Sequence, residues 1–211
     1  MEQSKLYYVH DPMCAWCWGY KPTWNRIEQA LIHNEAHRLE IVYLVGGLAE
    51  DNDQAMPMEM QQQIASYWQK IERYLGTQFN YDFWRDNTPR RSTYPACRAV
   101  LAARHLGAEK AMITAIQQGY YLRALNPSDN AVLVQLAEEL QLDAVQFHQL
   151  LASEALNQQL NSEIALARSI GGCSFPSLFF QHQGVVKELA IDYQDAEQTL
   201  RQIRLLLDKR E

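Results

Sequence analysis

Residues 11–19 read Asp-Pro-Met-Cys-Ala-Trp-Cys-Trp-Gly, and this stretch governs the interpretation of the whole chain. Two of its cysteines, Cys14 and Cys17, form a C-x-x-C. The apolar and aromatic run from Leu6 to His10 stops at the Asp-Pro turn just before them, as a β-strand would. A pattern with helical spacing begins just after them, so the sequence predicts that Cys14 lies at a helix N-terminus.

That position suits a nucleophilic cysteine. The thiolate is the reactive form in disulfide exchange, and the unpaired N–H groups and positive dipole end of a helix N-terminus stabilise the anion. Cys17 lies one helical turn further on, from where its thiol can attack a mixed disulfide formed at Cys14. The spacing therefore predicts a nucleophile, Cys14, and a resolving thiol, Cys17. A C-x-x-C beside a strand–helix–strand pattern is a thioredoxin-like signal.

The segments around the motif predict a mixed α/β fold. A second strand, residues 41–45, follows the helical segment and closes at Gly46-Gly47, and such a crossover favours parallel strands. From about residue 57 to residue 170 nearly every segment has helical spacing. Residues 176–180 and 185–189 then read as a hairpin, because a short loop containing Gly184 separates two apolar runs.

The last segment, residues 192–209, is predicted to be a helix. The chain thus alternates at its two ends and is helical in its middle. We expect a discontinuous sheet domain, residues 1–48 and 171–211, with residues 49–170 inserted as an all-helical domain.

Composition excludes several classes of protein. Four cysteines in 211 residues are too few for a disulfide scaffold. The net charge is −6, and the densest basic cluster, Arg90-Arg91 with Arg85 and Arg98, is small, so no nucleic-acid partner is expected. The N-terminal residues lack the pattern of a secretory signal, and the longest uncharged stretch, residues 169–186, is broken by Gly, Gln, His and Pro. We therefore expect a cytoplasmic protein with no membrane partner, whose thiols face a reducing pool.

The string D-P-x-C-x-W-C-W-G resembles the active-site segment of DsbA-like thioredoxin-fold proteins. It is most similar to the cytosolic branch of predicted protein-disulfide isomerases that includes FrnE-like proteins. The resemblance extends over the whole chain, including Gly-Gly-x-x-x-Pro at residues 171–176. It implies a thioredoxin-like fold with a large helical insertion between its βαβ and ββα halves. It also implies a thiol–disulfide oxidoreductase or isomerase that acts on protein, peptide or small disulfides.

The resemblance assigns further residues to the site. In the family a cis-proline faces the C-x-x-C, and the matching residue is Pro176. Phe175 would present backbone groups to an extended substrate strand. No metal or organic cofactor is implied, because the Cys14–Cys17 disulfide is itself the redox group. Many relatives have Pro where this chain has Ala15.

Four other residues are weighed as candidates. Trp16 is expected on an apolar rim that binds substrate. His10 could stabilise the Cys14 thiolate if protonated, although a histidine in a strand is more often only hydrogen-bonded. Cys173 is either an accessory thiol near the C-x-x-C or a small apolar filler. Cys97 is expected to be buried and unreactive.

Two alternative functions stay open. Kappa-class glutathione transferases and 2-hydroxychromene-2-carboxylate isomerases have a similar topology, and a glutathione site could lie between Pro176 and the helical insertion. They usually carry Ser near the position of Cys14. The second alternative is a non-enzymatic peptide-binding module, with zinc at the cysteines. A single C-x-x-C is only half of a common zinc site, so no metal is expected.

Overall fold

The computed structural model describes residues 3–208, and within them one mixed sheet forms in the strand order β2-β1-β3-β4. The strands are β1 (Ser4–His10), β2 (Leu39–Val45), β3 (Ser177–His182) and β4 (Val185–Leu189). β1 and β2 are parallel, with Ser4 opposite Leu39 and His10 opposite Val45. β3 is antiparallel to both β1 and β4. The predicted parallel crossover and the predicted hairpin are therefore confirmed.

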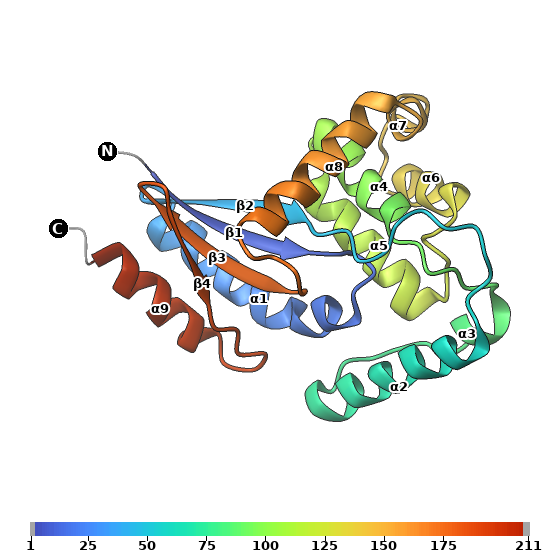
Figure 1. Cartoon of the computed structure of the whole chain (residues 1–211), viewed down its shortest axis with the longest axis horizontal. Helices are drawn as coiled ribbons and strands as arrows, with labels where there is room; N and C mark the ends of the chain where they lie inside the picture. Colours follow the sequence, from blue (N-terminus) through green and yellow to red (C-terminus); the bar gives the residue numbers. More distant parts are fainter. Residues whose placement is uncertain (1–2, 209–211) are drawn as a thin grey trace.

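Helices cover both faces of this sheet (Figure 1). Alternate residues of β1 point to opposite faces, so Leu6 and Tyr8 share one core cluster while Tyr7 and Val9 share another. The first cluster includes buried residues of α1 (Ala15–Glu35) and α9 (Ala196–Asp208), which pack against each other. The second cluster includes Ala167 near the end of α8 (Glu154–Ser169). Both faces of β1 are thus buried, and the C-terminal end of β1 leads into the start of α1.

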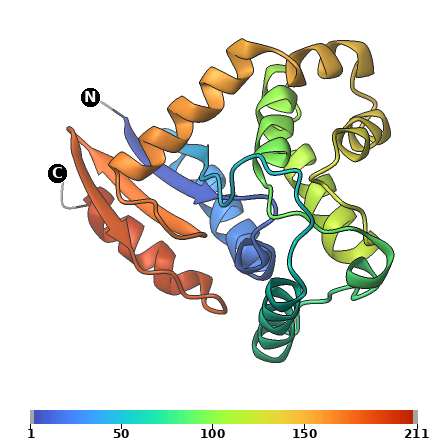
Figure 2. The same ribbon diagram turned by 45° about the vertical axis from the view of Figure 1, so that its right-hand side comes forward.

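The chain between β2 and β3 is helical, as predicted. Its helices are α2 (Met58–Leu75), α3 (Phe83–Asp86), α4 (Tyr94–His105), α5 (Glu109–Arg123), α6 (Asn130–Glu139), α7 (Ala144–Leu151) and α8. Figure 2 shows most of them gathered beside the sheet, with α8 running back over it. Buried residues of α4 and α5 belong to the same core cluster as β1 and α1. The division into separate domains near residues 48 and 171 stays a prediction.

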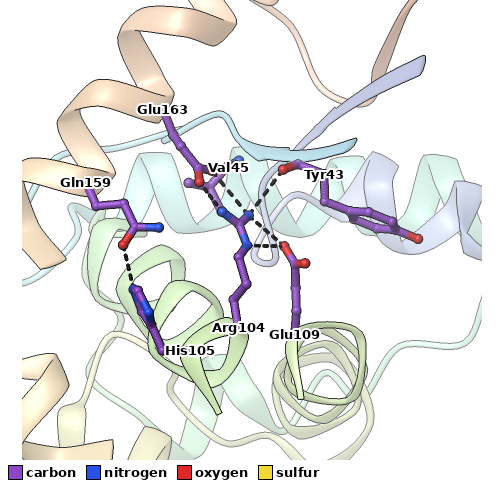
Figure 3. Close-up of polar contacts among 7 residues, drawn as sticks. All are labelled: Tyr43, Val45, Arg104, His105, Glu109, Gln159 and Glu163. Atoms are coloured by element: carbon purple, nitrogen blue, oxygen red, sulfur yellow. Dashed lines mark hydrogen bonds and ion pairs between the residues drawn. The ribbon is translucent and has the colours of Figure 1, made fainter. Parts of the chain in front are cut away.

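A half-buried guanidinium fastens this helical block to the sheet (Figure 3). Arg104 of α4 donates to the carboxylates of Glu109 and Glu163, and its Nη2 donates to the carbonyl oxygen of Tyr43 at 3.2 Å. Glu163 Oε2 in turn accepts from the backbone N–H of Val45 at 3.3 Å. Three helices, α4, α5 and α8, therefore meet at the end of β2 through one network.

The final helix begins later than predicted, at Ala196 rather than Asp192. Oδ1 of Asp192 accepts from the backbone N–H groups of Gln194 and Asp195, both at 2.8 Å, and this forms a polar turn instead of a helical one. The predicted end of the helix, Lys209, lies outside the described residues. Within those residues, no helix combines the length and the apolar character needed to cross a membrane.

Candidate active site

Cys14 occupies the position immediately before α1. Its backbone is extended, with φ −82° and ψ 117°, and its N–H donates to the carbonyl oxygen of Asp11 at 3.0 Å. The turn so formed ends β1 and begins the helix. The predicted placement of Cys14 at a helix N-terminus is therefore confirmed. Its side chain is 7% exposed, so it meets solvent only at an edge.

The thiol of Cys14 faces the segment that leads into β3. Its Sγ donates a hydrogen bond to the carbonyl oxygen of Phe175, 3.4 Å away. The peptide bond between Phe175 and Pro176 is cis, as the resemblance implied. Residues 161 positions apart in the chain thus meet at the reactive sulfur.

Phe175 is held in place from two sides. A Cβ added to Gly46, at the end of β2, would lie 1.9 Å from Cε1 of the Phe175 ring, so only glycine fits there without a shift of the ring. The guanidinium of Arg168 lies 5.3 Å from the ring centroid on another side. The carbonyl that contacts Cys14 is therefore positioned by β2 and α8 together.

Cys17 lies inside the first turn of α1 and is fully buried, with 0% exposure. Burial raises the pKa of its thiol well above the usual value, and the neighbouring Cys14 adds to the rise. Both cysteines are free thiols in this structure. The arrangement places one thiol at the surface edge and the second in the protein interior behind it.

The carboxylate of Asp11 organises the turn before Cys14. It is 0% exposed, and Oδ1 accepts from the backbone N–H of Met13 at 2.8 Å. Oδ2 accepts from the N–H of Leu48 and from Thr93 Oγ1, both at 2.7 Å, and from Cys97 Sγ at 3.5 Å. Burial raises the pKa of Asp11, although each of these donors acts to lower it. From the sequence, Asp11 is expected only as part of a turn. The signal for its larger role is that Asp before a turn commonly bonds to the backbone two residues on.

A pocket of about 510 Å³ opens beside Cys14. Its walls are mostly apolar and aromatic and include Trp16, Met56, Met60, Ile64, Tyr67, Trp68, Tyr120, Cys173 and Phe175. Trp16 is half-buried and meets Tyr193 edge-on at 5.2 Å. The predicted apolar surface near Trp16 is thus present, and its role toward substrate stays a proposal.

Arg91 is the cation that this pocket leaves uncompensated. The other members of the predicted basic cluster are paired: Arg85 with Asp82 and Asp86, Arg90 with Asp129, and Arg98 with Asp51. Arg91 has no carboxylate partner among residues 3–208, and it lines the pocket together with Cys14. The member of this cluster that keeps an unpaired charge is therefore one that lines the pocket.

The structure does not support the role predicted for His10. Its ring is 1% exposed and stacks on Tyr8, with ring centroids 5.3 Å apart, so it cannot contact a substrate. Burial lowers its pKa to about 3, and the charges of Arg104 and Lys21 act in the same direction. The imidazole is therefore neutral at neutral pH and offers no positive charge to Cys14.

The two remaining cysteines differ from each other. Cys97 is 0% exposed, and burial raises the pKa of its thiol, so the expectation of a buried, unreactive residue agrees with its surroundings. Cys173 is exposed on the wall of the pocket, which contradicts the interpretation as an apolar filler. Within the described residues, no three His, Cys, Asp or Glu side chains are grouped so as to hold a metal ion.

Known proteins share this fold. A family model described as thioredoxin matches residues 7–200. The fold matches that of a candidate protein disulfide isomerase from Nitrosomonas europaea with a TM-score of 0.85 at 24% identity, over 100% of both chains. It matches the cytosolic disulfide reductase DsbM from Pseudomonas aeruginosa, solved with GSH, with a TM-score of 0.75 at 23% identity, over 98% of this chain and 100% of that one.

Two further proteins resemble this chain less completely. The ClpXP adapter protein SpxH of Bacillus subtilis is 24% identical over 185 residues, which are 85% of this chain and 60% of SpxH. The match therefore spans less than two thirds of that relative. A 2-hydroxychromene-2-carboxylate isomerase matches with a TM-score of 0.58 at 10% identity, over 97% of this chain and 95% of that one. Below 25% identity such structural likeness shows a shared fold, here the DsbA-like thioredoxin fold with its helical insertion.

Proposed function

This chain belongs to the thioredoxin family, and from that premise we propose that it is a thiol–disulfide oxidoreductase with Cys14 as nucleophile and Cys17 as resolving thiol. The observation that carries the proposal is the position of the pair. Cys14 precedes α1 at the edge of an apolar pocket, and Cys17 lies fully buried one turn behind it. A structural pair would need neither the helix N-terminus nor the pocket.

The chemistry runs in two exchanges. The Cys14 thiolate attacks one sulfur of a substrate disulfide, forms a bond to it and releases the other sulfur as a thiolate. The Cys17 thiol then gives up its proton and attacks Cys14 Sγ, which releases the second substrate thiolate. The substrate gains two electrons and the pair becomes a disulfide. The reverse sequence oxidises a substrate dithiol, and return of the mixed disulfide to a different substrate thiol is isomerisation.

Loss of the Cys14 proton changes the neighbouring carbonyl as well. The hydrogen bond from Sγ to the oxygen of Phe175 needs the thiol proton, so it ends when the thiolate forms. The carbonyl is then available to accept an N–H from an extended peptide, as in strand addition. Phe175, next to Pro176, thus couples activation of the nucleophile to binding of the backbone that carries the target cysteine.

The pocket supports peptide segments with apolar side chains beside the reactive cysteine, because its walls carry Trp16 and several methionines. A second candidate substrate is glutathione or its disulfide. Arg91 favours it, since a guanidinium without a partner beside Cys14 suits a small thiol that carries carboxylates. The protein is proposed to act in the cytosol, where a reducing thiol pool would return the Cys14–Cys17 pair to the dithiol form.

The glutathione-transferase and carboxylate-isomerase alternative fits less well. Those proteins usually carry Ser where this chain has Cys14, and the intact pair of thiols would have no role in their chemistry. A zinc-binding module fits less well too, because Cys14 and Cys17 have no third ligand within the described residues.

The proposal is tested by reduction of insulin with dithiothreitol, followed by turbidity. Cys14→Ser should abolish the catalysed rate, because the hydroxyl is not ionised at neutral pH. Cys97→Ser is the matched control, since it removes a buried thiol and keeps a donor toward Asp11. Activity of Cys14→Ser equal to that of the native chain would refute the proposal.

A further inference from the structure

Cys17 is enclosed by protein, yet its resolving step requires that it lose a proton. The thiol is 0% exposed and its pKa is raised by burial. It lines a small cavity of about 60 Å³ that shares no residue with the substrate pocket and has the exposed Asn25 and Lys110 at its rim. The groups around that cavity come from α1, β1, β2 and α5: Tyr8, Cys17, Lys21, Trp24, Asn25, Glu28, Tyr43, Lys110, Ile113, Thr114 and Gln117. A cavity of this size with polar walls has room for water.

Lys21 lines both this cavity and a groove on the molecular surface. It lies one helical turn after Cys17 on α1, so the two side chains share a face of the helix. Lys21 also lines a groove of about 600 Å³ on the surface, together with Asn25 and Arg26. Its side chain therefore borders both the space next to the buried thiol and the outside of the molecule.

The amine of Lys21 is held without a carboxylate partner among the described residues. Nζ donates to Thr114 Oγ1 and to Gln117 Oε1, both at 2.9 Å. The nearest acid, Glu28, accepts instead from Tyr43 Oη at 2.8 Å and pairs with Lys110. A neutral amine has two N–H groups and one lone pair. The two hydrogen bonds use both donors, which leaves the lone pair of Nζ to accept a proton.

The charge state of Lys21 is consistent with this role. Burial lowers its pKa to about 8, against a smaller opposing effect of Glu28. An amine of that pKa is partly neutral near pH 7 and is recharged readily, which general acid–base groups require. The titratable groups around it are Cys17 and Glu28 of α1, Tyr8 and His10 of β1, Tyr43 of β2 and Lys110 of α5.

We propose that Lys21 accepts the proton released by Cys17 when the mixed disulfide is resolved, and passes it to the surface groove. The Cys17 S–H bond breaks and its proton reaches Nζ of Lys21 through water in the cavity. The Sγ–Sγ bond between Cys17 and Cys14 forms, and the bond from Cys14 to the substrate sulfur breaks. That sulfur leaves as a thiolate with the electron pair, and the Lys21 ammonium then releases its proton into the groove. This inference rests on the proposed function, since it concerns the second of the two exchanges.

Each exchange can be measured separately with the reduced full-length chain and dithiobis(nitrobenzoic acid) in a stopped-flow instrument. Attack by Cys14 releases one coloured thiolate, and resolution by Cys17 releases a second. All variants carry Cys173→Ser, so that the exposed third thiol adds no signal. Absence of the first release in the Lys21-containing chain would refute the proposed function, whereas the inference about Lys21 concerns only the second release.

Lys21→Met should leave the first release unchanged and slow the second by about 10²-fold at pH 7, the lower end for a general base. The difference should shrink as pH rises, because hydroxide then removes the Cys17 proton directly. Lys21→Arg should stay slow, since a guanidinium keeps the charge and cannot accept a proton. Arg26→Met is the matched control, because it removes a cation from the same groove outside the cavity.

Three results would overturn the inference. They are an unchanged second release in Lys21→Met at every pH, full rescue by Lys21→Arg, and equal slowing of both releases. Should Lys21→Met fail to fold, Lys21→Gln replaces it, because the amide can still donate to Thr114 and Gln117. The same slow second release is expected from it.

Discussion

Oγ1 of Thr93 donates a 2.7 Å hydrogen bond to Oδ2 of Asp11. Thr93 is the N-cap residue just before α4, and Asp11 directly follows β1, three residues before Cys14. The turn that leads to Cys14 is therefore bonded to the helical segment between β2 and β3 as well as to the sheet. The helical segment lines the pocket and, through Thr93, also fixes the backbone turn just before Cys14.

Replacement of Cys17 by Ser is expected to trap the first exchange. Cys14 can still attack a substrate disulfide, but the buried hydroxyl cannot displace the substrate. Mass spectrometry of Cys17→Ser after exposure to a disulfide-containing peptide should show one peptide bound at Cys14. An equally stable adduct at Cys17 in the Cys14→Ser variant would reverse the two roles.

Cys173 is expected to shorten the lifetime of that trapped species. It is exposed on the wall of the same pocket, so its thiol has access to a disulfide at Cys14. The adduct of Cys17→Ser/Cys173→Ser should outlast that of Cys17→Ser in a time course of peptide release. Identical lifetimes would mean that Cys173 takes no part as an accessory thiol.

Arg91→Leu should lower the rate with glutathione disulfide by about tenfold, the value of one charge-assisted hydrogen bond. The rate with hydroxyethyl disulfide, which has no carboxylate, should stay the same. Arg85→Leu is the control because Arg85 lies outside the pocket and is paired with Asp82. An equal loss for both disulfides would assign Arg91 a structural role instead of recognition.

His10 is expected to make the fold acid-sensitive. Its pKa is about 3 in the folded chain and about 6.5 when unfolded, so the unfolded state alone binds a proton between these values. The stability that follows from this depressed pKa is present above pH 6.5 and is lost as pH falls toward 3. From pH 7 to pH 5 the loss amounts to about 2 kcal/mol.

His10→Phe keeps a ring against Tyr8 and removes the titration. Between pH 7 and pH 5 its free energy of unfolding should therefore fall by about 2 kcal/mol less than that of the native chain. Urea denaturation at the two pH values measures the difference. His37→Phe, which changes an exposed histidine, should lose as much stability as the native chain. If His10→Phe loses as much as His37→Phe, His10 is not buried in its neutral form.

Arg104→Met should lower the free energy of unfolding by about 2–3 kcal/mol, because it leaves two half-buried carboxylates without their cation. Those carboxylates belong to Glu109 and Glu163 (Figure 3). Arg123→Met breaks an exposed pair with Glu139 and should leave the urea midpoint nearly unchanged. Equal effects of the two substitutions would show that the network does not fasten the insertion.

Local sequence patterns are sufficient to predict much of the fold. The strand before the C-x-x-C, the helix after it and the later hairpin follow from periodicity and turn residues within about ten positions. The placement of Cys14 just before α1 and of Cys17 in its first turn follows from the same local signals. The last helix was misplaced at its start because Asp192 forms a turn with its own neighbours, and Asp is equally common at a helix N-cap.

The sequence by itself thus determined most of the elements, their order and the position of the Cys14–Cys17 pair at the start of a helix, because each depends on residues close together in the chain. Only the tertiary structure decided which side chains meet and which are buried. It made His10 neutral, brought Cys173 to the surface of the pocket, left Arg91 unpaired beside Cys14 and placed Lys21 between Cys17 and solvent. Such outcomes depend on contacts between segments distant in the chain, since the free energy of a charge is set by what surrounds it in space and not by its neighbours in sequence.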